Sequence, residues 1–211
     1  MLTRLQGAKN GVIHGVRSIL VPPPAVGPLI SLFPGQFSTL LLGYEKTDFV
    51  KYIHHVKMVG STVFAPTNNA FAWLGIKANA FLFNTETGLK YLKAILKYHI
   101  APNATLYSDA FYDKTSSEGV DVFAREHYDL KTLLGDTRVG VDIATLGAFK
   151  SIRVNGFSHV SISDGIAKNG AIQVIDKVLL PPCKKHGHHK DDMTGEIEIE
   201  DLMDRLADYV E

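Results

Sequence analysis

One short pattern occurs near both ends of the chain: Asn10 begins NGVIHGVRSILVPPP and Asn169 begins NGAIQVIDKVLLPPC. The two copies stay in register from the shared Asn-Gly to the shared Pro-Pro, at an offset of 159 residues (169 − 10 = 159). Solenoid and propeller repeats recur every ~20–50 residues, whereas this offset has the size of a globular domain. We therefore expect tandem domains, with residues 24–182 forming a complete domain and residues 1–23 the C-terminal remnant of a preceding one.

Each copy of the pattern has the features of an element that closes a fold. The Asn-Gly pair supplies a tight turn at low steric cost. In the second copy Ile172, Val174, Val178 and Leu180 follow in the alternation of a buried strand. The Pro pair then ends the strand because neither residue can donate a backbone N–H. Residues 22–28 (PPPAVGP) are expected to form a short, stiff connector between the two modules.

Within the complete domain, helix-like segments come first and strand-like segments mostly later. Helical spacing of apolar residues marks 37–44, 48–55 and 85–98, with Thr47 as the expected N-cap of the second helix. Val63 and Phe64 form a strand-like run that leads into a short capped helix. Further strand-like runs lie at 129–134, 138–146, 149–154, 159–162 and 171–180, separated by turn residues such as Asp164-Gly165. This segregation favours an α+β domain with helices packed on antiparallel sheet.

Three motifs in this order resemble the fasciclin-like (FAS1) domain family: TVFAPTNNAF at 62–71, the pair Tyr98-His99, and the closing NGAIQVIDKVLLPP. The resemblance covers about residues 24–182. It implies a wedge of antiparallel β-strands with packed N-terminal helices, tandem copies, and an extracellular or cell-surface location. It also implies a noncatalytic binding module for cell adhesion or matrix organisation, with cell-surface or matrix proteins or glycans as partners and no cofactor.

The resemblance carries two expectations for single residues. Tyr-His pairs of animal fasciclin-like domains are implicated in integrin binding, so Tyr98 and His99 are candidate binding residues. We favour the structural alternative, in which Tyr98 packs into the core and His99 satisfies buried polar groups at a helix end. Gln173 stands where the family usually has His, which the first copy retains as His14. Gln replaces part of the hydrogen-bonding capacity of His but not its titration.

Asn103 begins Asn-Ala-Thr, an acceptor sequence for N-glycosylation just after Pro102, where an exposed turn is expected. If the domain is exported, Asn103 is a candidate glycosylation site. The lone cysteine, Cys183, excludes an intrachain disulfide. It suits a reducing compartment as an unpaired thiol, or an intermolecular bridge in an exported protein.

The segment after the domain holds His186, His188 and His189, followed by two aspartates. Imidazole and carboxylate groups can bind a transition metal, but the neighbouring Gly and Lys residues favour a solvated linker, and we expect no metal. From about residue 200 the chain shows the spacing of an acidic amphipathic helix, whose apolar stripe is Ile199, Leu202, Met203, Leu206 and Val210. This stripe packs either on the parent domain or on a partner. The second option would make the protein a vacuolar or endomembrane structural adaptor.

Charge and motif content exclude several other functions. The formal charge is zero, with four basic and nine acidic residues from Cys183 onward and therefore an excess of about five basic residues before it. No basic run with interleaved aromatics supports nucleic-acid binding. No apolar run reaches the ~18 residues that a transmembrane helix needs. Without a nucleophile elbow, a phosphate-binding Gly loop or zinc-type His-Glu spacing, we expect no enzyme.

Overall fold

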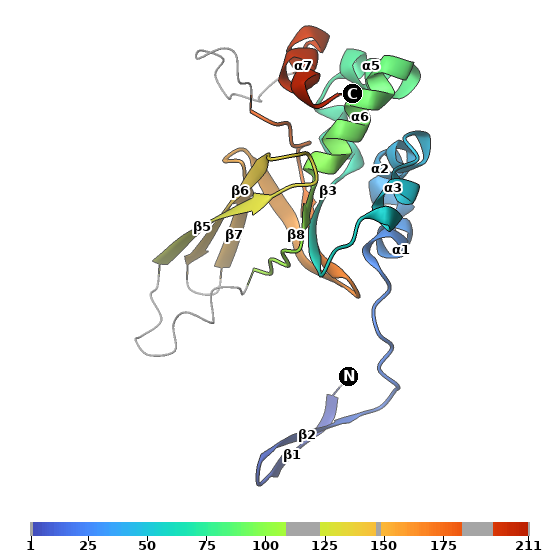
Figure 1. Cartoon of the computed structure of the whole chain (residues 1–211). Helices are drawn as coiled ribbons and strands as arrows, with labels where there is room; N and C mark the ends of the chain where they lie inside the picture. The colour runs from blue at the N-terminus through green and yellow to red at the C-terminus, as the bar shows by residue number, and fades with distance from the viewer. Residues whose placement is uncertain (1, 109–122, 147–148, 183–195, 211) are drawn as a thin grey trace.

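The computed structural model describes residues 2–108, 123–146, 149–182 and 196–210 of the chain, as an α+β fold (Figure 1). Its helices are α1 (Val26–Ser31), α2 (Pro34–Lys46), α3 (Phe49–His55), α4 (Asn68–Ala72), α5 (Ile76–Asn84), α6 (Glu86–Tyr98) and α7 (Ile199–Leu206). Its strands are β1 (Leu2–Ala8), β2 (Gly11–Val16), β3 (Ser61–Pro66), β4 (Ile100–Pro102), β5 (Phe123–Lys131), β6 (Arg138–Leu146), β7 (Phe149–Val154), β8 (Ser158–Ala167) and β9 (Gly170–Ile175).

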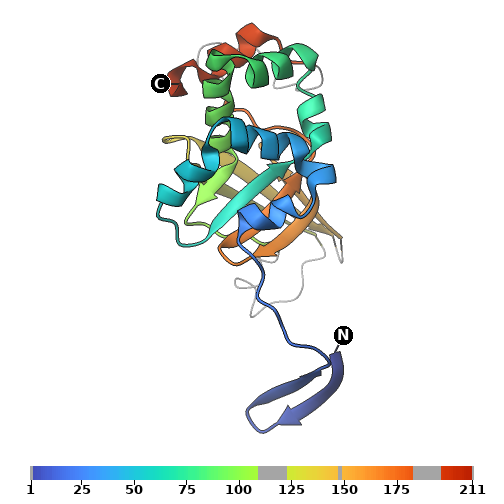
Figure 2. The same ribbon diagram turned by 90° about the vertical axis from the view of Figure 1, so that its right-hand side faces the viewer.

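The main sheet has the strand order β4-β3-β9-β8-β7-β6-β5, in which β3 and β9 are parallel and the other neighbours antiparallel. The expected antiparallel wedge therefore contains one parallel pair, β3 and β9, next to the edge strand β4. The Leu133 N–H, just after the edge strand β5, donates a hydrogen bond of 2.9 Å to the carbonyl of Ile100 in the other edge strand, β4. This bond brings the two edges of the sheet together. Helices α1 to α3 lie against β3 and β9, and α5, α6 and α7 gather at one end (Figures 1 and 2).

Helix α6 supplies much of the core because its apolar residues recur on one face. Thr85 caps the helix by accepting a hydrogen bond of 2.9 Å from the Gly88 N–H. Leu92, Ile95 and Leu96 are fully buried on the inner face, and each contributes about 1.5–3 kcal/mol through burial. The helix ends at Tyr98 and delivers His99 to the start of β4.

Strand β9 is the closing element of the sheet, and all six of its residues are buried. Gly170 opens the strand with φ 154°, and a Cβ built there would lie 2.1 Å from the Ser61 carbonyl oxygen. Only glycine allows so close an approach of β9 to β3.

The N-terminal copy of the pattern forms the hairpin of β1 and β2, which makes a separate two-stranded sheet. Ala8 pairs with Gly11, as Ala167 pairs with Gly170 between β8 and β9, and both turns have the sequence Ala-Lys-Asn-Gly. An extended segment separates this hairpin from the main body (Figure 2). Its Ile13 is 60% exposed, whereas the equivalent Ile172 is 5% exposed.

Several boundaries differ from those expected from the sequence. The last strand ends at Ile175 instead of Leu180, because Leu179 donates its N–H to the His99 ring rather than to a neighbouring strand. Asp164 does not break β8 but takes a left-handed conformation, φ 61°, within a register shift of the strand. Thr47 ends α2 with its hydroxyl on the Gly43 carbonyl, so α3 begins after Asp48. Helices α1 and α5 and strand β4 were not expected.

Candidate functional site

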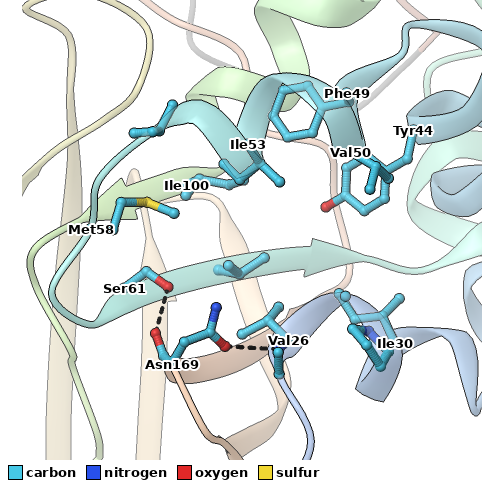
Figure 3. Close-up of a pocket in the computed structure, with 15 residues that line it drawn as sticks. Val26, Ile30, Tyr44, Phe49, Val50, Ile53, Met58, Ser61, Ile100 and Asn169 are labelled. Carbon is cyan, nitrogen blue, oxygen red and sulfur yellow. Dashed lines mark hydrogen bonds between the residues drawn. The ribbon is translucent and has the colours of Figure 1, made fainter.

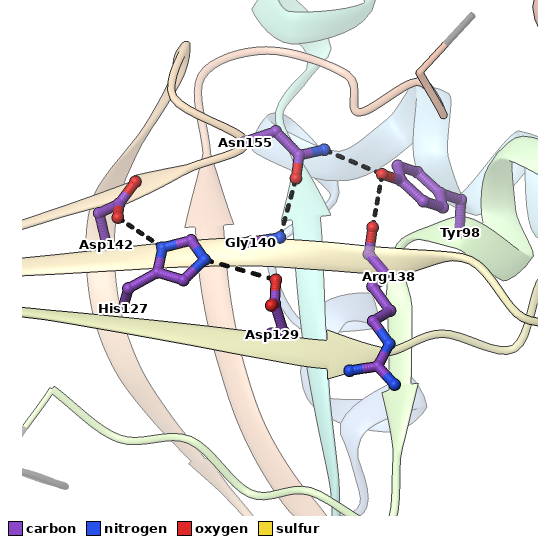
Figure 4. Close-up of polar contacts among 7 residues, drawn as sticks. All are labelled: Tyr98, His127, Asp129, Arg138, Gly140, Asp142 and Asn155. Atoms are coloured by element: carbon purple, nitrogen blue, oxygen red, sulfur yellow. Dashed lines mark hydrogen bonds and ion pairs between the residues drawn. The ribbon is translucent and has the colours of Figure 1, made fainter. Parts of the chain in front are cut away.

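Tyr98 lies at the end of α6 with 1% of its surface exposed. Its hydroxyl donates to the Arg138 carbonyl and accepts from the Asn155 side-chain amide, each at 3.0 Å. Asn155 has φ 50° and accepts a hydrogen bond from the Gly140 N–H. The phenol thus links α6 to β6 and to the turn between β7 and β8 (Figure 4). Burial raises the pKa of Tyr98 to about 12, so the hydroxyl remains a donor.

His99 is 2% exposed and bridges two parts of the fold. Its Nδ1 lies 2.8 Å from the Ile95 carbonyl, and its Nε2 accepts from the Leu179 N–H at 3.0 Å. This pair of contacts requires the neutral ring with its proton on Nδ1. Burial lowers the pKa of His99 to about 4, which keeps the ring neutral near pH 7. Both residues of the Tyr-His pair therefore hold the fold together from inside.

Gln173 occupies the centre of β9 with 1% of its surface exposed. Its amide nitrogen donates to the Leu106 carbonyl at 3.0 Å and to Asp164 at 3.2 Å, while its oxygen accepts from the Asp164 N–H at 3.2 Å. Asp164 in turn binds the Ser108 hydroxyl and N–H. The Gln amide thus both donates to and accepts from the polar groups around the bulge of β8, and unlike a His ring it does not titrate.

Asn103 lies in an exposed turn after β4 with φ 57°. Its side-chain oxygen accepts from the Val59 N–H at 2.8 Å, and its own N–H donates to the Gly60 carbonyl at 3.1 Å. Thr105, the third residue of the acceptor sequence, is also exposed. The structure places the sequence on the surface.

The acidic C-terminal helix α7 packs on α5 and α6 of the same chain. Leu202 and Leu206 of its apolar stripe are fully buried, whereas Met203 is 36% exposed. Ile197, two residues before the helix begins, donates its N–H to the Leu74 carbonyl and so holds the start of α7 against the domain. Of the two expected options, docking on the parent domain is the one that the structure shows. A partner would meet chiefly the acidic face of the helix.

Cys183, His186, His188 and His189 lie outside the described residues. Within the described ranges, no group of three or more His, Cys, Asp or Glu side chains is arranged to hold a metal ion. Across those same residues no helix has both the length and the apolar character needed to cross a bilayer.

One charged cluster was missed by the sequence analysis. His127 on β5 lies 2.7 Å from Asp142 on β6 and 3.4 Å from Asp129, all on an exposed face (Figure 4). The hydrogen bond to Asp142 raises the pKa of His127. Asp129 follows His127 at strand spacing, but the cross-strand partner depends on the register of β5 and β6, which the sequence pattern does not fix.

Exposed apolar side chains gather around the junction of α4 and α5. Trp73 and Ile76 are 56% and 83% exposed, and Leu42 of α2 lines one shallow groove with Ile76. The Lys177 ammonium lies 6.0 Å from the centre of the Trp73 ring. We refer to Leu42, Trp73 and Ile76 as the α4–α5 surface. Trp73 lines a neighbouring groove, and Ala72 borders both grooves. Large apolar side chains exposed near one another are candidate binding sites.

A second candidate is a pocket of about 320 Å³ bordered by α1, the end of α2, α3, β3 and β4 (Figure 3). It is lined mainly by aliphatic and aromatic side chains. Its residues are spread from Ala25 to Asn169, so no local sequence motif indicated it.

Residues 35–181 match the fasciclin domain family. The chain belongs to this family, and the fold described above is that of a fasciclin domain.

Two curated relatives and one solved structure are similar to the chain. Aurofusarin biosynthesis cluster protein S of Gibberella zeae is 31% identical over 97% of this chain and 56% of its own length. Transforming growth factor-beta-induced protein ig-h3 of Sus scrofa is 26% identical over 88% of this chain and 23% of its own. A FAS1 domain pair from the insect cell adhesion molecule fasciclin I has a TM-score of 0.49 and 22% identity, over 66% of this chain and 44% of that one. The chain thus spans about half or less of these proteins.

Proposed function

We propose that the protein is a noncatalytic fasciclin-type binding module that acts in cell adhesion or extracellular matrix organisation. The observation that carries this proposal is the family match, which extends over residues 35–181 and so over nearly the whole domain. The relatives have names from different settings, a biosynthesis cluster and a growth-factor-induced protein. These names specify no common partner, so the proposal rests on the family match: the domain surface is the binding element, with cell-surface or matrix proteins or glycans as partners.

The α4–α5 surface is the proposed contact region. Tyr98 and His99 are buried, so a partner that leaves the fold intact cannot reach their side chains. Trp73, in contrast, exposes an aromatic ring, and exposed Trp residues are frequent anchors of protein interfaces. It is also the only Trp of the chain, so its fluorescence reports directly on contacts at this surface.

A binding screen with the full chain tests the proposal. Intact cells, matrix proteins and polysaccharides are titrated while binding and Trp73 fluorescence are followed together. For the wild-type chain we expect saturable binding that changes the Trp73 fluorescence. The binding affinity should fall at least about tenfold in the double variant Trp73→Ser/Ile76→Ser. The matched control is Phe149→Ser on β7, which is 79% exposed and distant in sequence from this surface. No saturable binding to any probe would remove the adhesion proposal. Loss of binding in the control alone would place the contact region elsewhere.

We further propose that residues 1–23 are the C-terminal part of a second fasciclin unit. Three consecutive pairs of the β1–β2 hairpin, beginning with Ala8 and Gly11, correspond to those of β8 and β9. Coding sequence upstream of Met1 tests this. The proposal requires in-frame residues with a segment like that of Thr62–Phe71, which would supply the missing counterpart of β3. An upstream stop codon would contradict it.

An extracellular location is part of the same proposal, and it makes Asn103 a glycosylation site. Secretion of the chain from a eukaryotic host, with a signal peptide added, should give a product whose mass falls on glycosidase treatment. The variant Asn103→Gln should lack this mass difference, whereas Asn84→Gln, which is exposed and lies in no acceptor sequence, should retain it. An unmodified wild-type product would contradict this assignment.

A further inference from the structure

The pocket of about 320 Å³ lies beneath α1 and α3 and has the walls of a small-molecule site. Ile30, Phe49, Val63 and Ile100 contribute apolar side chains, each exposed by no more than 4%. They come from α1, α3, β3 and β4, so the cavity is framed by elements of the packed body of the domain (Figure 3). Val50, which is 50% exposed, stands at its rim.

One hydroxyl group points into this apolar space. Tyr44 at the end of α2 stacks on Phe49 with 5.2 Å between ring centres and 12° between planes, which fixes the direction of its phenol. The hydroxyl is directed into the pocket (Figure 3), and among the described residues it has no hydrogen-bond partner. Burial raises the pKa of Tyr44, so the group remains protonated and can donate. Tyr44 is half-buried and its hydroxyl is not among the buried polar atoms that lack a partner, so solvent reaches it within the pocket and a ligand acceptor would take the place of water there.

A second polar group lies at the opposite wall. Asn169 in the turn between β8 and β9 accepts the Val26 N–H on its side-chain oxygen at 2.9 Å. Its backbone carbonyl accepts the Ser61 hydroxyl at 3.1 Å. Because the oxygen of its amide is engaged by Val26, the amide nitrogen faces the pocket (Figure 3). The two ends of the cavity thus present donors.

We propose that this pocket binds a small, uncharged, mainly apolar molecule that carries a hydrogen-bond acceptor oxygen within reach of the Tyr44 hydroxyl. No Lys, Arg, His, Asp or Glu side chain is among the lining residues that the structure describes, so a charged ligand would have no counter-ion. A volume of about 320 Å³ equals roughly ten water volumes. The ligand therefore has on the order of ten to fifteen non-hydrogen atoms.

A pair of matched probes tests both the pocket and the hydroxyl. 4-Phenyl-2-butanone offers a ketone oxygen on an apolar body of suitable size, and butylbenzene is nearly the same body without the oxygen. Binding of each to the full chain is titrated by ligand-observed NMR. We expect saturable binding of both, with the ketone bound more tightly. Tyr44→Phe should lower the affinity for the ketone by about five- to tenfold and leave that for the hydrocarbon unchanged.

Occlusion of the rim supplies the second readout. Val50→Trp adds bulk at a half-exposed position and should abolish binding of both probes, whereas Leu32→Trp, 66% exposed and outside the pocket lining, should not. The proposal is overturned if neither probe binds the wild-type chain, or if Val50→Trp leaves binding intact. Equal effects of Tyr44→Phe on the two probes would overturn the role of the hydroxyl. None of these results depends on adhesion, so the surface-binding proposal can fail independently.

Discussion

At the scale of single residues, His99 shows how a family motif can serve the fold. Its two ring nitrogens join Ile95 at the end of α6 to Leu179 after β9, and this geometry holds only for the neutral ring. The folded-state pKa of about 4 lies below the ordinary value of 6.5. The unfolded chain therefore binds a proton more readily than the folded one in this window. The contribution of His99 to the stability is therefore present above about pH 6.5 and is lost as the pH falls toward 4.

We predict that His99 alone removes about 2 kcal/mol of stability between about pH 7.5 and pH 5. The variant His99→Gln should lose this pH-dependent part of the stability, because a Gln side chain does not titrate in this range. Gln can still donate and accept hydrogen bonds at a buried position, as Gln173 does in β9. Urea unfolding of both proteins at the two pH values gives the difference, from which the other histidines cancel. An identical pH dependence in the two proteins would contradict the buried neutral ring.

At the scale of elements, the two copies of the closing hairpin have different surroundings. Gly170 starts β9 against the Ser61 backbone, and a Cβ there would approach the carbonyl oxygen to 2.1 Å. At Gly11, its counterpart in β2, a Cβ atom would have no neighbouring atom within 4 Å. The same sequence signal thus closes the main sheet in one place and forms a free-standing hairpin in the other.

This difference predicts opposite outcomes for one substitution. Gly170→Ala should cost about 3 kcal/mol or more, because backbone must move and the residue is held at φ 154°. Gly11→Ala should change the free energy of unfolding by no more than about 0.5 kcal/mol. Equilibrium urea denaturation of the two variants checks both values. A small effect at Gly170 would show that β9 does not pack on β3 in this way.

At the scale of the whole molecule, the sequence was enough for the family, the α+β class and the order of most elements. The shared motifs are local and strongly patterned, and the fasciclin match at 35–181 confirms the family and the fold class. The sequence did not predict the pocket or the His127 cluster, and it left open whether α7 docks on the domain or on a partner. Each joins residues from distant segments, so each depends on strand register and helix packing that periodicity does not determine.

The central claim is that residues 24–182, with α7 docked on them, fold without the N-terminal hairpin. The domain begins where the Pro24 carbonyl accepts the Lys168 N–H and Asn169 accepts the Val26 N–H, and a hairpin of two strands adds little stability in water. Urea unfolding of the whole chain and of a chain without residues 1–23 is the most direct test. We predict one cooperative transition in each, with the same midpoint and slope. A shorter chain that unfolds at clearly lower urea, or fails to fold, would contradict the claim.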